Sequence, residues 1–585
     1  MRSFFKFFFA SFLALIIFSF IGLIFMFAVI GKAFAPSRVV VSANSVLVLD
    51  ASTALNEQRT EDKLGSLLPG GGSEAPGLYD MVRLLRHAGT DENIKGIYLK
   101  VGGNGNNFAT NEELRNALLA FRKSGKFIYA YAEVIPQQAY YLASTADKIW
   151  LNPKGGLEFD GFSMELMFLK GTLEKLEIQP QIFYNGKFKS ATEPLRETKM
   201  TDANRLQTNV FLGELYGKFL NGIAERRGVD TATLHSYANE GLVRFPTDAL
   251  KYKLVDGLKY DDEVMDEFRK KIGIDKDQSI NFISAKKYAS AVDYEDNGAD
   301  GSIALIYAQG DIVGGSSESN NTIASDSYIK IIREARQDKD IKAIVFRVNS
   351  GGGSALASES IWRELTLAKK SKPVIVSMGD YAASGGYYIS CMADSIFAQP
   401  NTLTGSIGVF AILPNMQGFF NNKLGITFDG VKTAQYADLG NASRPLTDGE
   451  KRILQSSVDT IYANFKGRVT EGRKLADVVV DSIAQGRVWT GIEAKKLGLV
   501  DRIGGLDDAI KCAAKMANVP AYSLVEYPSV KDPLFSFLSK EEDEAKSKAI
   551  QKELGAYYKI YKQVKALERL TDGVQARLPF DMIIR

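Results

Sequence analysis

The sequence predicts an α/β protein that consists of two tandem copies of one domain behind an apolar N-terminal segment. Three observations predict this class: the two halves match each other, β-branched runs alternate with amphipathic stretches, and one long uncharged run lies near the N-terminus. We expect an anchor, a first repeat, a second repeat and a C-terminal helical tail, at residues 1–36, 37–295, 296–530 and 531–585.

The duplication is visible when the two halves are compared directly. Residues 91–101 (DENIKGIYLKV) match residues 338–348 (DKDIKAIVFRV) at a spacing of 247 residues. The same spacing pairs Glu112 with Glu359, Tyr140 with Tyr387, Pro153 with Pro400, and Gly161 with Gly408. In each copy, β-branched runs such as KAIVFRV alternate with helical patterns such as ASESIWRELTLAKK, which indicates βαβ units and a mostly parallel sheet.

An uncharged apolar run extends from Phe7 to Ile30 and is long enough to span a bilayer as one helix. Arg2 and Lys6 precede it, which favours a cytoplasmic N-terminus and places the rest of the chain outside the cytoplasm. A cleaved signal peptide is the alternative, and it gives the same location for the body of the protein. At residues 539–567, Lys, Glu, Ala and Leu predict a C-terminal helix.

The composition excludes several function classes. The 72 basic and 69 acidic side chains are interspersed and give a net charge of +3, so no nucleic-acid partner is expected. The two cysteines, Cys391 and Cys512, cannot form a disulfide framework or a zinc motif. The two histidines, His87 and His235, lie in sequence typical of a surface or an interface. Hydrolytic chemistry would therefore use a base other than imidazole.

Two glycine-rich turns follow predicted strands in the second copy. The first, RVNSGGGSA (347–355), brings backbone N–H groups close to a ligand, and could be a phosphate cradle, a tight turn or an oxyanion hole. The second, SMGDYAASGGYYIS (377–390), places Ser384 at the entry to an apolar helix. Ser384 could be a helix cap or a nucleophile, and the N–H of Gly385, with that of Gly353 or Gly352, would then stabilise an oxyanion.

These two turns, together with NTLTGSIGVF (401–410), resemble the signal peptide peptidase A family of the Clp protease/crotonase superfamily. The N-terminal anchor and the duplication match the long form of that family, so two tandem Clp/crotonase-like domains are expected. Gly351 stands where the family usually has proline. The resemblance implies that Ser384 is the nucleophile and that the hydroxyl of Ser406 orients a lysine; a serine that only stabilises a turn is the alternative for Ser406.

The first copy contains YNGKFKSATEPL (184–195), which resembles the lysine motif of the family and identifies Lys189 as the general base. A solvated surface lysine is the alternative. The two copies are complementary: Gln137 stands where the second copy has Ser384, and Tyr436 or Ala437 stands where the first has Lys189. We therefore expect one site assembled from both repeats, with Lys189 neutral and buried. The half that supplies the lysine could belong to the same chain or to a neighbouring subunit.

The resemblance implies a serine endopeptidase that degrades signal peptides left in the membrane, without a metal or an organic cofactor. It also implies a neighbouring subunit or a closely packed ring as the source of the lysine, and a homotetramer. The expected location is the inner membrane, with lipid contacted by the N-terminal helix and the catalytic body on the periplasmic side. The alternatives are a broader membrane-associated peptidase, a non-enzymatic scaffold, and an acyl-CoA enzyme of the crotonase fold, which would need an acidic catalytic residue.

Overall fold

The computed structural model describes most of the chain between Val40 and Pro528 and short segments outside that range. The described residues are 7–8, 11–22, 40–60, 75–295, 297–298, 300–317, 321–529, 550, 553–555, 558, 573–578 and 584. The predicted anchor and the predicted C-terminal helix lie largely outside them, although residues 11–22 are helical. Within the described part of the chain, none of the helices combines the length and apolar character needed to cross a membrane.

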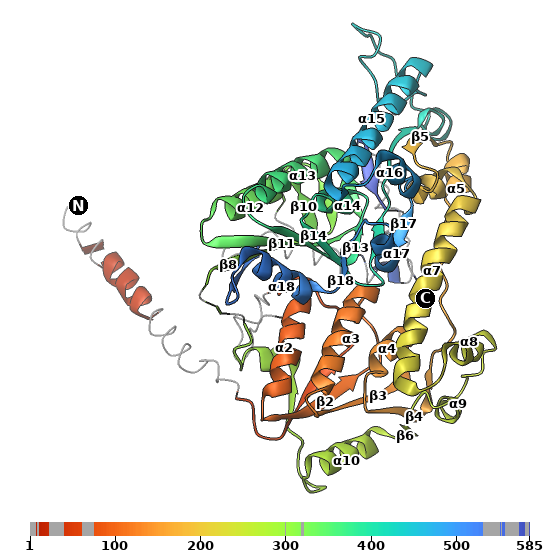
Figure 1. Cartoon of the computed structure of the whole chain (residues 1–585). Coiled ribbons are helices and arrows are strands. Elements are labelled where there is room, and N and C mark those ends of the chain that lie inside the picture. Colours follow the sequence, from red (N-terminus) through yellow and green to blue (C-terminus); the bar gives the residue numbers. More distant parts are fainter. Residues whose placement is uncertain are drawn as a thin grey trace.

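The first repeat is built on a six-stranded parallel sheet with the order β6-β4-β3-β2-β1-β7. Its strands are β1 (Ser45–Asp50), β2 (Ile94–Lys100), β3 (Phe127–Ile135), β4 (Lys148–Leu157), β6 (Gly257–Leu258) and β7 (Phe282–Ser284). Its helices are α2 (Leu78–Thr90), α3 (Phe108–Arg122), α4 (Gln137–Ala143), α8 (Thr231–Asn239), α9 (Pro246–Lys251), α10 (Asp261–Ile272) and α11 (Ala285–Ala289). Figure 1 shows α2 and α3 on one face of the sheet and α10 on the other.

The second repeat has the same plan on a sheet whose main path is β17-β15-β13-β11-β8-β19. Its strands are β8 (Ser302–Gln309), β11 (Ile341–Ser350), β13 (Val374–Ala383), β14 (Ser395–Ala398), β15 (Leu403–Gly405), β17 (Val488–Thr490), β18 (Arg502–Ile503) and β19 (Ser523–Tyr527). Its helices are α12 (Ser325–Gln337), α13 (Ala355–Lys369), α14 (Gly385–Ser390), α15 (Asp448–Arg473), α16 (Asp477–Ile483), α17 (Gly491–Lys496) and α18 (Leu506–Ala517). The mostly parallel sheet expected in each repeat is confirmed.

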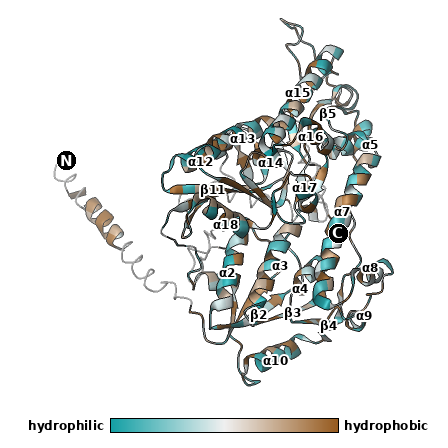
Figure 2. Ribbon diagram, viewed as in Figure 1, coloured by the Kyte–Doolittle hydropathy of each residue, from teal (hydrophilic) through white to brown (hydrophobic). Residues whose placement is uncertain are grey.

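Burial follows the expected pattern, because strands covered on both faces are predominantly apolar. In β11, every residue from Ala343 to Val348 is buried. The larger core lies between this sheet and helices α12, α13 and α15, and a smaller one lies under α18. Figure 2 shows the apolar residues concentrated on the strands and polar residues along outer helices such as α10 and α12.

A third sheet joins the two repeats and has the order β10-β9-β12-β20-β16-β5. Its strands are β5 (Gln179–Asn185), β9 (Asp311–Val313), β10 (Thr322–Ala324), β12 (Gly352–Ser354), β16 (Val409–Asn415) and β20 (Gln575–Arg577). Strand β5 of the first repeat pairs antiparallel with β16 of the second along its whole length. Because β20 is a strand, the expectation of a helical tail is wrong for this part of 531–585; its neighbours β12 and β16 supply the pairing that its own short sequence does not predict.

The connection between the repeats continues through α5 (Lys170–Lys175), α6 (Glu193–Arg196) and the long helix α7 (Asp202–Arg227). Helix α7 begins at a Thr201 cap, whose hydroxyl accepts a hydrogen bond from the N–H of Asn204, and ends at Gly228 in the left-handed conformation. Figure 1 shows α7 running along both repeats, from α5 beside the second repeat to α8 in the first. The helix thus bridges the seam near the segment that contains Lys189.

Two buried polar contacts hold the repeats together beside the strand that leads to Ser384. The Asp380 carboxylate of β13 accepts hydrogen bonds from the N–H groups of Ala109 and Thr110 and from the Thr110 hydroxyl, at the N-terminus of α3. Burial raises the pKa of Asp380. The fully buried Arg347 guanidinium of β11 donates to the carboxylates of Glu57 and Glu113 in the first repeat, at 2.8 and 2.7 Å.

Replacing Arg347 with Met is expected to lower the free energy of unfolding by about 3–5 kcal/mol, because Glu57 and Glu113 would remain as buried carboxylates without their cation. Arg86 provides a matched control, because it also pairs across the two repeats, with Asp507, but its side chain is 47% exposed. Arg86→Met should cost less than about 1 kcal/mol. Urea unfolding followed by tryptophan fluorescence measures both losses, and equal losses would contradict the prediction.

Candidate active site

Ser384 lies between the end of β13 and the start of α14, where the chain turns sharply from strand to helix. Its φ of 56° and ψ of −112° are strained for a residue with a Cβ. The Ser384 N–H donates to the carbonyl of Gly405 at 2.8 Å, and the side chain is fully buried. The Ser384 side chain makes no capping hydrogen bond to α14, so the helix-cap interpretation does not account for this serine.

Lys189 follows β5 in the first repeat and reaches the serine across the seam. Its Nζ lies 2.7 Å from Ser384 Oγ, 3.1 Å from Ser406 Oγ and 3.2 Å from the Ser406 carbonyl oxygen. The structure therefore brings together three of the residues that the sequence singled out. Because the contact forms within one chain, the expectation of a lysine supplied by a neighbouring subunit is wrong: the β5–β16 pairing carries this loop into the second repeat of the same molecule.

The Lys189 amine lies in a dry environment, since only 1% of the residue is exposed. Burial lowers the pKa of Lys189 well below its usual value of 10.5, because the charged ammonium is poorly solvated there. Its hydrogen-bond partners are hydroxyl and carbonyl oxygens, which can contact an uncharged amine without an unpaired charge. An uncharged lysine beside a serine hydroxyl can accept the hydroxyl proton.

The Lys189 segment is held by residues that the sequence did not indicate. Gln207 of α7 donates from Nε2 to the Phe188 carbonyl and to Ser190 Oγ, each at 3.1 Å, and accepts from the Val488 N–H of β17 at 3.2 Å. Gly486 packs directly on this segment, because a Cβ there would lie 2.7 Å from the Lys189 backbone nitrogen. Gln207 was missed because no sequence motif distinguishes one buried glutamine within a long helix. Gly486 was missed because the sequence gives no indication that it packs against the Lys189 segment.

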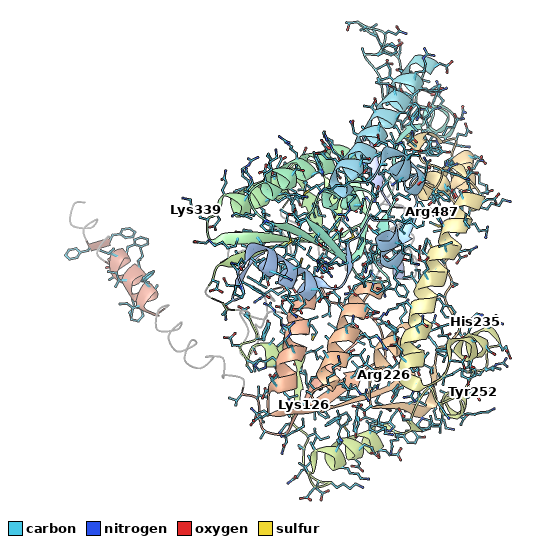
Figure 3. The ribbon with its side chains drawn as sticks, in the orientation of Figure 1. Lys126, Arg226, His235, Tyr252, Lys339 and Arg487 are labelled. Carbon is cyan, nitrogen blue, oxygen red and sulfur yellow. The ribbon has the colours of Figure 1, made fainter. Side chains whose placement is uncertain are left out.

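Ser406 lies in the turn after β15, with a φ of 49°. Its N–H donates to the Arg487 carbonyl at 2.7 Å, which fixes the turn against the segment that leads into β17. Figure 3 labels Arg487 in this region, and its guanidinium lies over the rings of Phe188 and Trp489. The same neighbourhood thus supports the segments of Ser406 and Lys189, which keeps the serine hydroxyl in reach of the amine.

The two glycine-rich turns meet beside Ser384. A Cβ on Gly352 would lie 2.7 Å from the Gly385 nitrogen, so only glycine allows the turns to come this close. The expectation that Gly352 could donate to an oxyanion is wrong, because its N–H already donates to Ser350 Oγ at 3.1 Å. Gly353 and Gly385 remain the candidate donors from the two turns.

In the first repeat, glutamine takes the place of the serine. Gln137 begins α4 after β3, as Ser384 precedes α14 after β13. Its Nε2 donates to the Gly161 carbonyl at 2.7 Å, and Ser384 Oγ lies 3.4 Å from the carbonyl of the matching Gly408. His235 lies on α8 at the outer edge of the first repeat in Figure 3, away from the Ser384 turn.

Comparison with known proteins agrees with the duplication. The sequence matches Peptidase family S49 twice, at residues 120–275 and 366–520, once in each repeat. It is 37% identical to Protease 4 of Salmonella typhi over 84% of this chain and 82% of that protein. For Protease 4 of Haemophilus influenzae (strain ATCC 51907 / DSM 11121 / KW20 / Rd) the identity is 33%, over 90% of this chain and 88% of that protein. The identity to the chloroplastic serine protease SPPA of Arabidopsis thaliana is 34%, over 74% of this chain and 64% of that protein.

These relationships and the α/β fold define the chain as a serine peptidase. Within that class it belongs to Peptidase family S49, because the matched segments cover more than half of its length. The predicted relationship to the signal peptide peptidase A family and the predicted pair of repeats are both confirmed.

Gln207 is expected to be a positioning residue for Lys189. Gln207→Ala should lower kcat about 10- to 100-fold with little change in KM, because small displacements of a catalytic group carry penalties of this size. Leu206→Ala, at an exposed neighbour on the same helix, should leave kcat unchanged. Peptide hydrolysis with purified variants measures both parameters. A change in KM alone, or an equal effect of the two substitutions, would count against this role.

Proposed function

We propose that this peptidase uses a Ser–Lys dyad, with Ser384 as the nucleophile and Lys189 as the general base. The observation that carries the proposal is the 2.7 Å contact between Lys189 Nζ and Ser384 Oγ in a buried site. The direction of the Lys189 pKa supports it, because a base must be uncharged before it can accept a proton. Ser406, 3.1 Å from Nζ, orients the amine.

The reaction then proceeds through an acyl-enzyme. Lys189 accepts the Ser384 proton as Oγ attacks a peptide carbonyl carbon, and the N–H groups of Gly353 and Gly385 stabilise the oxyanion. The Lys189 ammonium donates its proton to the leaving amine as the peptide C–N bond breaks. Water, deprotonated by the same amine, attacks the ester and releases the new carboxylate and free Ser384.

The proposed substrates are signal peptides that remain in the membrane after preproteins have been processed. The resemblance of the Ser384 and Ser406 turns to signal peptide peptidase A supports this substrate class, and the apolar run Phe7–Ile30 supports a single-pass anchor in the inner membrane. The positive residues Arg2 and Lys6 support a body on the periplasmic side. A broader membrane-associated peptidase is the second candidate, and the hydrolysis experiment below distinguishes them.

Assembly into a homotetramer is also part of the proposal. The resemblance supports it, and so do exposed apolar side chains on the segment that follows β16, because such clusters mark interaction surfaces. These side chains are Leu424, Ile426, Phe428, Val431, Tyr436 and Leu439. Figure 1 shows this segment beside the projecting end of α15.

Ser384→Ala should abolish labelling by a fluorophosphonate, and Lys189→Ala should lower both labelling and peptide hydrolysis by about 10³-fold or more, because the two groups act as a unit. Lys187→Ala, at an exposed lysine in the same loop, is the control and should retain full activity. Gel fluorescence and mass spectrometry of a synthetic signal peptide in detergent micelles measure the two readouts.

Persistent labelling of the Ser384 variant would refute the nucleophile. A polar-core version of the same signal peptide separates the substrate classes: preference for the apolar peptide supports a signal peptide peptidase, and equal cleavage supports the broader peptidase.

Activity should increase with pH, because only the uncharged Lys189 can act as the base. Burial lowers the Lys189 pKa, so the midpoint of the increase in kcat/KM should lie below 10.5, the ordinary value for lysine. Below that midpoint Lys189 is mostly an ammonium, which has no lone pair to accept the Ser384 proton, so the activity falls. Peptide hydrolysis across a pH series gives the midpoint. A rate that rises only around or above pH 10.5 would contradict a desolvated base.

A further inference from the structure

The short strand β20 lies between two strands that border the proposed active site. It pairs antiparallel with β12, which contains Gly352 and Gly353, and with β16, which follows the Ser406 turn. The chain between β19 and β20 contributes no strand of this sheet among the described residues. The C-terminal segment therefore fills a slot that would otherwise leave two strand edges open for an extended peptide.

The register of this pairing fixes which carbonyl of the segment meets the glycine turns. The N–H of Leu578 donates to the Gly351 carbonyl, and the N–H of Ala355 donates to the Val574 carbonyl. Hydrogen-bonded pairs alternate in an antiparallel ladder, so Gly353 and Ala576 between them form a bonded pair. The N–H of Gly353, proposed to stabilise the oxyanion, thus faces the Ala576 carbonyl.

Two further distances place the Ala576 carbonyl oxygen at the junction of the glycine turns. It would lie 2.1 Å from a Cβ on Gly352 and 3.0 Å from a Cβ on Gly385. Ala576 itself is fully buried in the core of the second repeat, so a larger side chain would have no room. The Ala576 carbonyl oxygen therefore lies beside both of the turns that contain the proposed oxyanion donors.

Leu578, two residues further on, is anchored in an apolar pocket at the seam. It is 7% exposed and belongs to a buried cluster with Phe211, Leu215, Ala383, Leu403 and Val488. Between these positions Arg577 points to the other side and pairs with Asp311 at 2.7 Å. Further along, the Ile584 carbonyl accepts a hydrogen bond from Gln138 of the first repeat at 3.0 Å. Backbone pairing, the buried Leu578 side chain and the Arg577–Asp311 ion pair all hold the segment in place.

We propose that residues 574–578 occupy the substrate-binding slot of this peptidase and compete with substrates in the same molecule. The slot takes an extended peptide with a small residue at the scissile carbonyl and a leucine-sized apolar residue two positions later. Strands β12 and β16 bind the peptide backbone by strand pairing. The apolar side chain is selected by a pocket formed by Phe211, Leu215, Leu403 and Val488. This proposal rests on the proposed function, because the Ala576 position is defined by the Gly353 and Gly385 donors.

Leu578→Asp should release the segment, because a carboxylate cannot be buried in the apolar pocket without a partner. The rate of fluorophosphonate labelling and kcat/KM for an added peptide should both increase at least about 5-fold, since binding of the free slot no longer requires displacement of the tail. Leu250→Asp introduces the same charge at an exposed leucine of α9 and should change neither rate. Rates that stay equal or fall in the Leu578 variant would overturn the proposal.

A binding measurement makes the test independent of catalysis and of the proposed nucleophile. A fluorescent peptide with the sequence of residues 573–580 (GVQARLPF) should bind the full-length Ser384→Ala/Leu578→Asp protein, as measured by fluorescence anisotropy. It should bind the Ser384→Ala protein at least about 5-fold more weakly, because the tail occupies the slot there. The same peptide with tryptophan in place of its alanine should bind neither.

The experiments distinguish failure of the proposed slot from failure of the proposed dyad. No binding to the double variant, or equal binding of the tryptophan peptide, would overturn the slot. The peptide could bind as expected while the Ser384→Ala protein is still labelled by the fluorophosphonate as strongly as the wild type. That result would overturn the dyad and leave the proposed slot in place.

Discussion

The whole site depends on one buried amine that is carried from the first repeat into the second. Strand β5 pairs along its full length with β16, and the loop that follows places Lys189 Nζ 2.7 Å from Ser384 Oγ. Seven paired residues define the position of the loop far better than a flexible contact between two surfaces would. Burial removes the solvent that would stabilise the ammonium, so the same geometry that delivers the amine also lowers its pKa.

Because Lys189 and Ser384 come from different repeats, the interface between the repeats must be rigid. A shift of one repeat against the other would separate the amine from the hydroxyl. The strand that ends at Ser384 also contains Asp380, whose carboxylate accepts hydrogen bonds from the start of α3 in the first repeat. Arg347, on the neighbouring strand β11, is paired with two carboxylates of the first repeat. Buried ionic contacts of this kind add little net stability over apolar packing, but they tolerate only one relative placement of the repeats. The first repeat, which has Gln137 at the position that matches Ser384, thus supplies the lysine and the contacts that fix its placement.

The sequence predicted the residues whose chemistry distinguishes them and missed those that act through position. Ser384 and Lys189 could be paired because each repeat lacks what the other has, and scarce histidine excluded the usual base. Whether they meet within one chain depends on the pairing of β5 with β16, two strands more than 200 residues apart, for which local patterns contain no signal. Gln207 and Gly486 were missed for the same reason, since their role comes from packing against the Lys189 loop. Strand β20 has three residues, and its conformation is imposed by the edges on either side.

The proposed substrate slot has a consequence for how the proposed apolar substrates would be recognised. A transmembrane segment in lipid satisfies its own backbone as a helix, so it must unwind before β12 and β16 can bind its N–H and C=O groups. Recognition through the backbone is tolerant of side chains, which suits substrates that share apolar character but little sequence. Selectivity then comes from the small space at Ala576 and the apolar pocket around Leu578, both features that an apolar peptide core rich in alanine and leucine satisfies at many registers. In the proposed mechanism, a tail that meets the same two requirements competes directly with such substrates, and the free slot binds only peptides that have already unwound from the helical state.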